Sequence, residues 1–417
     1  MITLIEALNY RSLKYIRQPL GPFHVLIGPN ASGKSTFLDV VAFLGRLVSD
    51  GVEAAVTERT ENFVDLLWKR EGTRFELAIE GALPAEVIAK LGKSKFDTIR
   101  YEVAVGIVPE SRMEELGILH ERVFLKRGEV VFSEARFVFP DTNVSPITLL
   151  HKLNSKWQTV VSKSAKGIDQ FESEVPNETN GGNYNFKLGR YKSALGNLPP
   201  DETQFPAGTW LKGLLTEGVL PIRLDSVALS RPSPPNRRQG LRANGSGLSW
   251  LVYEYITIRN IKKWVRHVRT SVPDLVTVAP MLRPEDRHRY LMLEYENGVQ
   301  IPSWMASDGT LRMLALTLLA YLSDSRGIYL VEEPENGIHP KAVETVYQSL
   351  SSVYDAQVLM TSHSPVILSC ASPDVILCFA KNEEGATDIV TGANHPRLQE
   401  WQGETNLGQL FAAGVLG

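Results

Sequence analysis

Cysteine is scarce in this sequence of 417 residues: only Cys370 and Cys378 occur, where a secreted disulfide-linked domain would use more. We interpret both as small core residues, because their spacing does not form a Cys-x-x-Cys pair. No stretch approaches the roughly 18 apolar residues that a membrane span requires, and Met1–Tyr10 lacks the features of a signal peptide. These absences predict a soluble, cytoplasmic protein without a membrane partner.

An excess of charge of one sign is also absent, because 44 basic residues face 47 acidic residues and the net charge is −3. The chain therefore has no general attraction for nucleic acid or an anionic membrane, and any DNA contact would come from a local patch. Neither an internal repeat nor a sustained heptad pattern occurs, which excludes a long coiled coil. The hydrophobic content of 43% is sufficient for at least one large core.

The first third of the chain predicts a strand, a turn and a helix, followed by further strands. Apolar and β-branched residues predict strands at Ile2–Leu8 and Phe23–Ile27, and apolar residues at helical spacing predict a helix over Lys34–Val48. Alternating apolar residues then predict an antiparallel meander with one face in solvent. Its strands are expected at Phe75–Ile79, Ile99–Ile107, Val123–Leu125 and Val130–Phe139.

The C-terminal third alternates strands with helices, which indicates a parallel sheet with covered faces. The strands are expected at Ile328–Val331, Val358–Met360 and Val375–Phe379, and the helices at Thr310–Leu322, Pro340–Val353 and from Pro365. Upstream, a helix is predicted over Leu248–Val268, and Glu296-Asn297-Gly298 predicts a hairpin between Leu291–Tyr295 and Val299–Ile301. Asn177–Asn185 lacks periodicity and is expected to be an exposed loop.

Gly28–Ser35 carries the most specific motif, because its sequence fits the pattern G-x-x-x-x-G-K-[ST]. Glycines let backbone N–H groups turn inward around phosphate oxygens, and the following helix directs its positive dipole end at the same anion. Lys34 is expected at the β- and γ-phosphates of a nucleotide, and the Ser35 hydroxyl on magnesium. The expected nucleotide-binding residues of this segment are Asn30, Ala31, Ser32, Gly33, Lys34, Ser35 and Thr36.

Two carboxylates, Glu332 and Glu333, follow the predicted strand Ile328–Val331. Neighbouring strand residues point to opposite sides, so the two acids can have different roles. We expect Glu332 to hold magnesium, directly or through water, and Glu333 to orient or deprotonate the attacking water. His363 follows the next apolar strand and is expected at the same sheet edge, where it can contact the γ-phosphate.

Together these segments resemble the motif set of the ABC-type ATPases. In chain order the matching segments are Gly28–Ser35 (Walker A), Ser307–Thr310 (a divergent signature), Ile328–Glu333 (Walker B), Glu335–Pro340 (the D-loop) and His363 (the H-loop). By itself, Ser307–Thr310 is compatible with either an anion site or an ordinary helix N-cap. The sequence around Glu333 and His363 is similar to that of the OLD-like and RecF-like ATPases of bacterial DNA repair and phage defence.

This resemblance implies an α/β fold: an ABC-type ATPase head with a mixed or parallel central sheet flanked by helices, an antiparallel β-subdomain and an inserted helical subdomain. A single ATPase domain would comprise residues 1–140 and 285–417, and residues 141–284 would be an inserted, mainly helical or loop region. In this family the signature of one copy completes the nucleotide site of the other. The resemblance therefore implies ATP and Mg²⁺ as cofactors and a homodimer or higher homo-oligomer. It also implies that Lys34, Glu333 and His363 act in catalysis. Ser307 and Gly309 would take the serine and glycine roles of the signature and bind nucleotide, with Ser307 reaching the γ-phosphate in the opposite copy.

Three departures from the family pattern predict slow hydrolysis. Walker B ends in Glu332-Glu333 instead of Asp-Glu, the signature is not Leu-Ser-Gly-Gly-Gln, and no glutamine lies between Thr36 and Arg100 to form a Q-loop. Elsewhere two interpretations stay open for Tyr10 and Arg11, which are expected either near the adenine or in packing.

Several functions are compatible with these observations. The leading hypothesis is an ATP-driven switch in a DNA-related or antiphage pathway that controls a separate effector. A RecF-like DNA clamp is the second, with phosphate contacts from a segment that otherwise forms a solvated loop and contains Arg231, Arg237, Arg238 and Arg242. A transporter ATPase subunit and a nucleotide-binding scaffold without turnover are the others.

The segment after the last predicted strand, Asn382–Gly417, is too short for the nuclease domain that OLD proteins add. Glu383, Glu384 and Asp388 are accordingly interpreted as a solvated turn. The apolar stretch Leu407–Leu416 is expected either to pack on the rest of the chain or to dock a partner.

Overall fold

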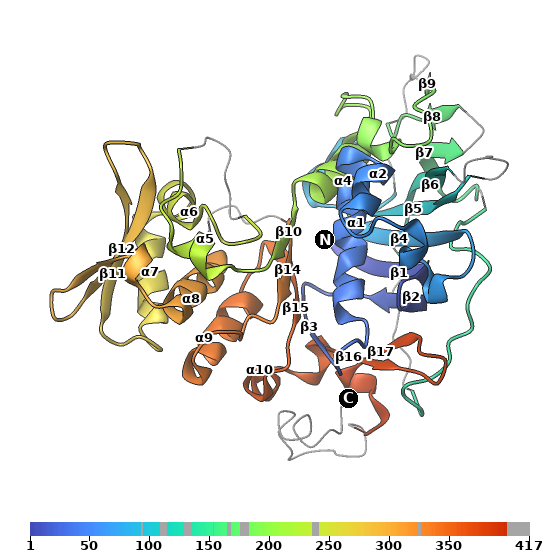
Figure 1. Ribbon diagram of the computed structural model, residues 1–417. Helices are drawn as coiled ribbons and strands as arrows, with labels where there is room; N and C mark the ends of the chain where they lie inside the picture. Colours follow the sequence, from blue (N-terminus) through green and yellow to red (C-terminus); the bar gives the residue numbers. More distant parts are fainter. Residues whose placement is uncertain are drawn as a thin grey trace.

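The computed structural model describes residues 1–92, 95–108, 115–128, 136–152, 154–164, 168–175, 183–235, 242–322 and 327–397. Within these ranges the strands form sheets of eight, six and three strands. Figure 1 shows the eight-stranded sheet on the right, the six-stranded sheet in the middle and the three-stranded sheet on the left. The long helix α1 (Lys34–Asp50) stands between the two larger sheets.

The eight-stranded sheet is antiparallel throughout, which confirms the predicted meander at its central strands. In spatial order it comprises β2 (Leu13–Pro19), β1 (Ile2–Tyr10), β4 (Arg74–Ala82), β5 (Thr98–Ile107), β6 (Leu116–Lys126), β7 (Gln158–Ser164), β8 (Asp169–Phe171) and β9 (Tyr184–Phe186). Of the strand predicted at Val130–Phe139, residues 130–135 lie outside the described ranges, and residues 136–139 are not in a strand.

The prediction that one face of this sheet is in solvent is wrong, because β5 is buried on both faces. Arg100 extends from the second face and forms ion pairs with Glu6 at 2.6 Å, Glu80 at 3.0 Å and Glu102 at 2.6 Å. Residues 148–151 cover this charge cluster, and the backbone N–H of His151 donates to Glu102 at 3.0 Å. Charged residues at alternate strand positions predicted a solvent-exposed face. Here these residues instead neutralise one another beneath residues 148–151.

The six-stranded sheet is parallel except at β17, in agreement with the predicted C-terminal part. Its spatial order is β10 (Val219–Ile222), β14 (Gly327–Glu332), β15 (Ala356–Thr361), β3 (Phe23–Ile27), β16 (Ile376–Lys381) and β17 (Thr387–Thr391). The sequence pattern did not reveal β10 and β17, because β10 is short and β17 follows a tight turn at positive-φ Gly385.

This sheet separates two hydrophobic cores. Leu26, Leu330 and Leu359 belong to the core that contains α1, whereas Val25 and Val331 belong to the core on the opposite face. Helices α8 (Asp308–Leu318), α9 (Pro340–Ser351) and α10 (Pro365–Cys370) cover that opposite face (Figure 1). The shorter helices α2 (Val52–Thr57) and α4 (Pro206–Thr216) lie beside α1, and α3 (Ala85–Lys90) packs against α4.

The three-stranded sheet comprises β11 (Leu275–Leu282), β12 (Arg289–Tyr295) and β13 (Gln300–Pro302), and β12 with β13 confirms the predicted hairpin. Helices α5 (Ser226–Ser230), α6 (Leu248–Tyr255) and α7 (Ile258–Val268) lie beside it. The single helix predicted over Leu248–Val268 is therefore wrong. Ile256 and Thr257 are extended, and the Thr257 hydroxyl caps α7 by accepting the N–H of Asn260.

The expected insertion, residues 141–284, is not separate from the sheets of the head. Strands β7 to β9 extend the eight-stranded sheet, and β10 pairs in parallel with β14. The division into one ATPase domain and one insertion therefore stays a prediction. Most of the loop expected at Asn177–Asn185, like Leu407–Leu416, lies outside the described ranges, and Tyr184 and Asn185 belong to β9.

Two further interpretations are corrected by burial. Cys378 is buried as expected, but Cys370 is exposed at the end of α10. Asp388 is not part of a solvated turn: it is 1% exposed within β17 and accepts two hydrogen bonds from Arg136, at 2.6 and 2.7 Å. Glu384 is exposed and pairs with Lys14 at 2.7 Å.

Candidate functional site

The loop Gly28–Ser35 joins β3 to α1 and turns sharply around its centre. Gly28, Ala31 and Gly33 have φ angles of 142°, 62° and 108°. A Cβ atom on Gly28 would lie 2.1 Å from the carbonyl oxygen of Phe379, so only glycine fits there. Within the described ranges, the buried Ser32 hydroxyl has no hydrogen-bond partner. A glycine-rich turn, a spare hydroxyl and a helix N-terminus together suit an anion such as a phosphate group.

Lys34 begins α1 and is the one cation of this loop. Its Nζ donates to the carbonyl oxygens of Gly28 at 2.7 Å and Pro29 at 2.9 Å. Burial lowers the pKa of Lys34, and the nearby negative charge of Glu333 acts in the opposite direction. The ammonium is therefore held at the loop, where it fits phosphate charge. Of the other expected binding residues, the exposed ones are Asn30, Ala31 and Ser35, and Thr36 is half-buried.

Thr387 in β17 supports the same loop from behind. Its hydroxyl donates to the carbonyl oxygen of Ser32 at 2.8 Å, and its backbone N–H donates to the carbonyl oxygen of Ser12 at 3.0 Å. Ser12 lies in the turn between β1 and β2. A Cβ atom on Gly33 would lie 2.2 Å from the Thr387 hydroxyl, so the glycine allows this close approach.

Glu332 ends β14 and faces the start of α1. One carboxylate oxygen, Oε2, lies 3.5 Å from the Ser35 hydroxyl. The other, Oε1, accepts two hydrogen bonds from the Arg223 guanidinium, at 2.9 and 2.5 Å. A serine hydroxyl and a carboxylate oxygen are ligands that Mg²⁺ accepts, with water and nucleotide phosphates completing its shell. The structure thus brings together Ser35 and Glu332, the two residues expected at magnesium, and their role as metal ligands stays a prediction.

Glu333 is held in an unusual backbone conformation immediately after the strand. Its φ angle is 45°, which is left-handed and costly for a residue with a side chain. The backbone N–H donates to the carbonyl oxygen of Thr361 at 3.1 Å. One carboxylate oxygen accepts the side-chain amide of Asn336 at 2.6 Å, and the other lies 3.9 Å from Nε2 of His363. The turn therefore directs the carboxylate at the end of β15.

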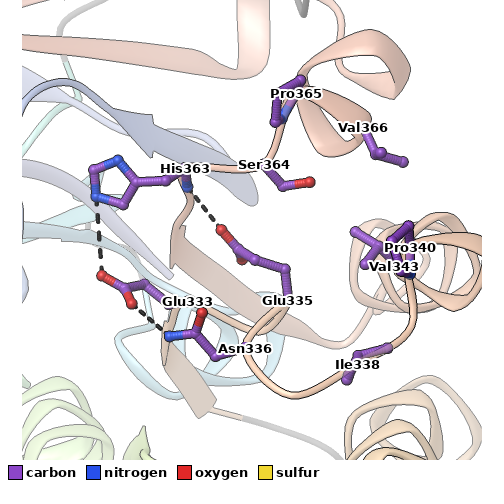
Figure 2. A pocket seen from close by; sticks show the side chains of 10 residues that line it. All are labelled: Glu333, Glu335, Asn336, Ile338, Pro340, Val343, His363, Ser364, Pro365 and Val366. Atoms are coloured by element: carbon purple, nitrogen blue, oxygen red, sulfur yellow. Dashed lines mark hydrogen bonds and ion pairs between the residues drawn. The ribbon is translucent and has the colours of Figure 1, made fainter. Parts of the chain in front are cut away.

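His363 follows β15 and is fixed by the segment after β14. Glu335 accepts the backbone N–H of His363 at 2.7 Å and the Ser362 hydroxyl at 2.8 Å. Figure 2 shows Glu333, Asn336 and His363 joined on one side of a pocket of about 400 Å³. Its apolar wall comes from α9 and α10 and includes Pro340, Val343 and Val366.

The structure thus brings Lys34, Ser35, Glu332, Glu333 and His363 to the carboxyl edge of the six-stranded sheet. Ser307 lies at the N-terminus of α8, which covers the face of this sheet opposite α1. Its hydroxyl caps α8 by accepting the N–H of Thr310 at 3.2 Å. A Cβ atom on Gly309 would lie 2.8 Å from the carbonyl oxygen of Gly337. The expected signature therefore packs against the expected D-loop of its own chain.

Tyr10 and Arg11 pack on α1. The Tyr10 hydroxyl donates to Asp39 at 2.5 Å, its side chain is fully buried, and its ring lies 4.8 Å from that of Phe75. Arg11 forms an ion pair with Asp39 at 3.2 Å. Burial of the Tyr10 ring favours the packing interpretation over an adenine contact.

Sequence reasoning missed three residues of the site. Arg223 follows a strand of only four residues in a region without periodicity, so no sequence signal pointed to it. Glu335 and Asn336 lie within the D-loop resemblance, but the sequence did not indicate that their side chains hold His363 and Glu333.

Comparison with known protein families gives a match to an AAA domain. Residues 23–82 and 256–369 match the family model described as "AAA domain, putative AbiEii toxin, Type IV TA system". These ranges include the loop Gly28–Ser35, Ser307, the Glu332-Glu333 pair and His363. No curated protein shows a significant match to the chain.

Two solved structures share the fold. The structure of the SmcHead bound to the C-winged helix domain of ScpA has a TM-score of 0.55 and 14% identity, and the match covers 94% of this chain and 97% of that chain. The Smc head domain with an extended coiled coil, bound to the C-terminal domain of ScpA derived from Pyrococcus furiosus, has a TM-score of 0.54 and 13% identity, with 96% and 98% covered.

The predicted fold class is confirmed: this is an SMC head-like α/β fold with parallel and antiparallel sheets. Together with the family match, it supports an ABC-class P-loop ATPase. Among the described helices, none has the length and apolar character needed to cross a membrane. The same part of the chain contains no group of three or more His, Cys, Asp or Glu side chains arranged for a metal ion.

Proposed function

We propose that this chain is an ATP-hydrolysing ABC-type ATPase that acts as a dimerisation switch in a DNA-related or antiphage-defence pathway. The observation that carries the proposal is the separation of the site into two parts. One part lies at the carboxyl edge of the six-stranded sheet and comprises Lys34, Ser35, Glu332, Glu333 and His363. The other part is Ser307, whose hydroxyl caps α8 on the sheet face opposite α1. A second copy would supply its Ser307 to the nucleotide site of the first.

Each residue has a role that its surroundings support. ATP with Mg²⁺ supplies the phosphoanhydride bond to be broken and a positive charge beside it. The N–H groups of the loop and the ammonium of Lys34 hold phosphate oxygens, and Ser35 with Glu332 holds the metal. Glu333 accepts a proton from the attacking water, while the Asn336 amide fixes the direction of its carboxylate and His363 lies 3.9 Å away.

A separate effector is the second part of the proposal. The family description names a TA system, and both Smc head structures were determined with ScpA bound. The sequences of the segments Glu332–Pro340 and Thr361–Pro365 are similar to those of the OLD-like ATPases. These similarities favour a chain whose ATP-held dimer controls a partner protein.

ATP turnover and solution mass, with and without ATP and Mg²⁺, test the switch in the wild type and in Glu333→Gln. The amide keeps the shape of Glu333 but cannot accept the proton, so we expect turnover in the wild type and an ATP-held dimer or larger assembly in the variant. Lys34→Ala in the Glu333→Gln background is the control and should lose the assembly. If neither protein hydrolyses ATP or changes its mass with nucleotide, the switch is contradicted, and a scaffold without turnover is the function that remains.

Nucleic-acid binding is a second candidate function, and α7 provides the observation that favours it. Arg259, Lys262, Lys263 and Arg266 lie at helical spacing on one exposed face of α7, which contains no acidic residue. Trp264, Val265 and Val268 are buried on the other face. Such a basic stripe suits a phosphate backbone. Of the arginine-rich segment, Arg231 and Arg242 are exposed, and Arg237 and Arg238 lie outside the described ranges.

Binding to duplex DNA at several salt concentrations tests this second function. Lys262→Gln with Lys263→Gln should weaken binding and reduce its dependence on salt. Lys152→Gln with Lys156→Gln removes the same charge from another exposed segment and is the matched control. An equal loss in both double variants would indicate a general charge effect and exclude the stripe as the DNA site.

A further inference from the structure

Arg223 is the residue of the site that no motif contains. It follows β10 directly, and β10 pairs in parallel with β14 so that Ile222 lies opposite Val331. The next residues along the two strands are Arg223 and Glu332, and their side chains form an ion pair at 2.5 Å. The backbone of Arg223 is fixed as well, because its N–H donates to the carbonyl oxygen of Ala243 at 2.7 Å.

We propose that Arg223 is a positioning residue for the metal ligand Glu332, an inference that rests on the magnesium–nucleotide site proposed above. The guanidinium occupies Oε1 through two donors, and Oε2 is the oxygen that faces Ser35. The two ligand atoms, Ser35 Oγ and Glu332 Oε2, are 3.5 Å apart. Adjacent ligands of an octahedral Mg²⁺ lie about 3 Å apart, because each is about 2.1 Å from the ion. The carboxylate is thus held close to its ligating position.

The length of Glu332 explains why this position needs such a partner. Walker B in the ABC-type pattern has aspartate at the magnesium position, and glutamate adds one methylene and one rotatable bond. Two donors of the planar guanidinium, Nε and Nη2, converge on Oε1 and restrict that additional freedom, because together they hold this oxygen in the guanidinium plane. Arg223 and the longer acid therefore form one unit that offers a single oxygen to the metal.

Stability of the fold does not account for this ion pair. The side chain of Arg223 is 69% exposed and that of Glu332 is 27% exposed, and exposed ion pairs contribute little to folding. Replacement of Arg223 should consequently leave the fold intact and act on the site. The segment after Arg223 also leads to the expected signature helix: Asp225 caps α5, and the Ser226 hydroxyl accepts the guanidinium of Arg312 in α8 at 3.2 Å.

Competition with magnesium is the opposite interpretation, in which the guanidinium occupies the place of the ion and must leave first. The geometry points against it, because the arginine lies on the oxygen that Ser35 does not contact. The two interpretations differ in sign. Loss of a positioning residue weakens the binding of magnesium, whereas loss of a competing cation strengthens it.

Binding of a fluorescent ATP analogue, titrated with Mg²⁺ and measured also without metal, tests the proposal in Arg223→Ala and Arg223→Lys. Loss of an outer partner of a metal ligand costs about 10- to 100-fold in metal affinity. We expect that increase in the Mg²⁺ concentration for half-maximal binding in Arg223→Ala, with metal-free binding unchanged. Arg223→Lys keeps the charge but not the planar fork and should give an intermediate value.

Arg269→Ala is the matched control, because Arg269 forms an exposed ion pair with Glu296 at 2.7 Å away from the site. An unchanged or lower Mg²⁺ requirement in Arg223→Ala, with a wild type that binds the analogue in a magnesium-dependent way, would overturn the inference alone. A wild type that does not bind the analogue would instead contradict the proposed function.

Discussion

The carboxylate of Glu335 accepts the backbone N–H of His363 at 2.7 Å, so the segment after β14 holds the segment after β15. The same oxygen accepts the Ser362 hydroxyl at 2.8 Å. Two neighbouring parallel strands thus end in segments that are linked by one side chain. His363 in turn lies 3.9 Å from Glu333, and the link therefore controls a contact of the proposed general base.

Removal of this link should slow ATP turnover without abolishing nucleotide binding. Loss of hydrogen bonds to a carboxylate corresponds to about a tenfold lower kcat in Glu335→Ala, with KM changed much less. Glu335→Gln keeps one acceptor oxygen and should retain more activity. Glu344→Ala removes an exposed acid from α9 and is the control. Steady-state kinetics that show the same kcat in Glu335→Ala and the control would contradict the positioning role.

Gly309→Ala should weaken the ATP-held dimer while leaving the fold intact. The added methyl group would lie 2.8 Å from the carbonyl oxygen of Gly337 and would push the D-loop away from α8. Overpacking of this size costs about 1–3 kcal/mol, which corresponds to a dimer weaker by about 5- to 150-fold where the whole cost acts on dimerisation. Light scattering with ATP in the Glu333→Gln background measures the effect. Gly213→Ala on α4 is the control, because a methyl group there has nothing within 4 Å.

Arg100→Met should destabilise the protein strongly. The guanidinium is 2% exposed and pairs with Glu6, Glu80 and Glu102, so its removal leaves buried carboxylates without their common partner. We expect a loss of about 3–5 kcal/mol in the free energy of unfolding, measured by urea denaturation. Lys90→Met interrupts an exposed pair with Glu202 at 3.7 Å, and its effect should stay within about 0.5 kcal/mol. Similar losses in both variants would exclude a special role for the cluster.

Glu174 should make stability fall as the pH rises towards neutrality. Burial raises its pKa to about 7, although the backbone N–H groups of Ala207 and Gly208 oppose the shift. The folded state therefore binds more protons than the unfolded state between the ordinary carboxyl pKa and pH 7, and this contribution costs about 2 kcal/mol between about pH 5 and pH 7. Glu174→Gln cannot ionise and should lack this component.

Urea denaturation of the wild type and Glu174→Gln at both pH values isolates the component, because other titrating groups contribute equally to the two proteins. The difference between the two free energies of unfolding should change in favour of the variant as the pH rises. A difference that does not depend on pH would show that Glu174 ionises normally.

The sequence predicted the part of the site that depends on parallel strands. Glu332 ends β14 and His363 follows the neighbouring strand β15. Parallel neighbours end at the same edge of a sheet, so the proximity of the two residues follows from topology alone. The loop Gly28–Ser35 was predictable for a related reason, since its glycines, lysine and following helix form a local unit. Both predictions required no knowledge of distant contacts.

Contacts between segments far apart in the chain were not predictable. Arg223 reaches Glu332 across 109 positions, and nothing near Arg223 in the sequence indicates a site. The buried face of β5 was misjudged because a charged residue at alternate positions has the same pattern whether water or other charges surround it. Periodicity could not reveal the break at Ile256, since the apolar spacing continues through it.

The support of the Gly28–Ser35 loop by Thr387 has a mechanical consequence. Thr387 belongs to the six-stranded sheet, and through Ser12 it is tied to the turn between β1 and β2 of the eight-stranded sheet. The loop therefore lies where the two larger sheets are connected, and a rotation of one sheet against the other would change its support. A partner that binds the outer strands of the eight-stranded sheet would therefore affect the release of nucleotide without contacting the nucleotide.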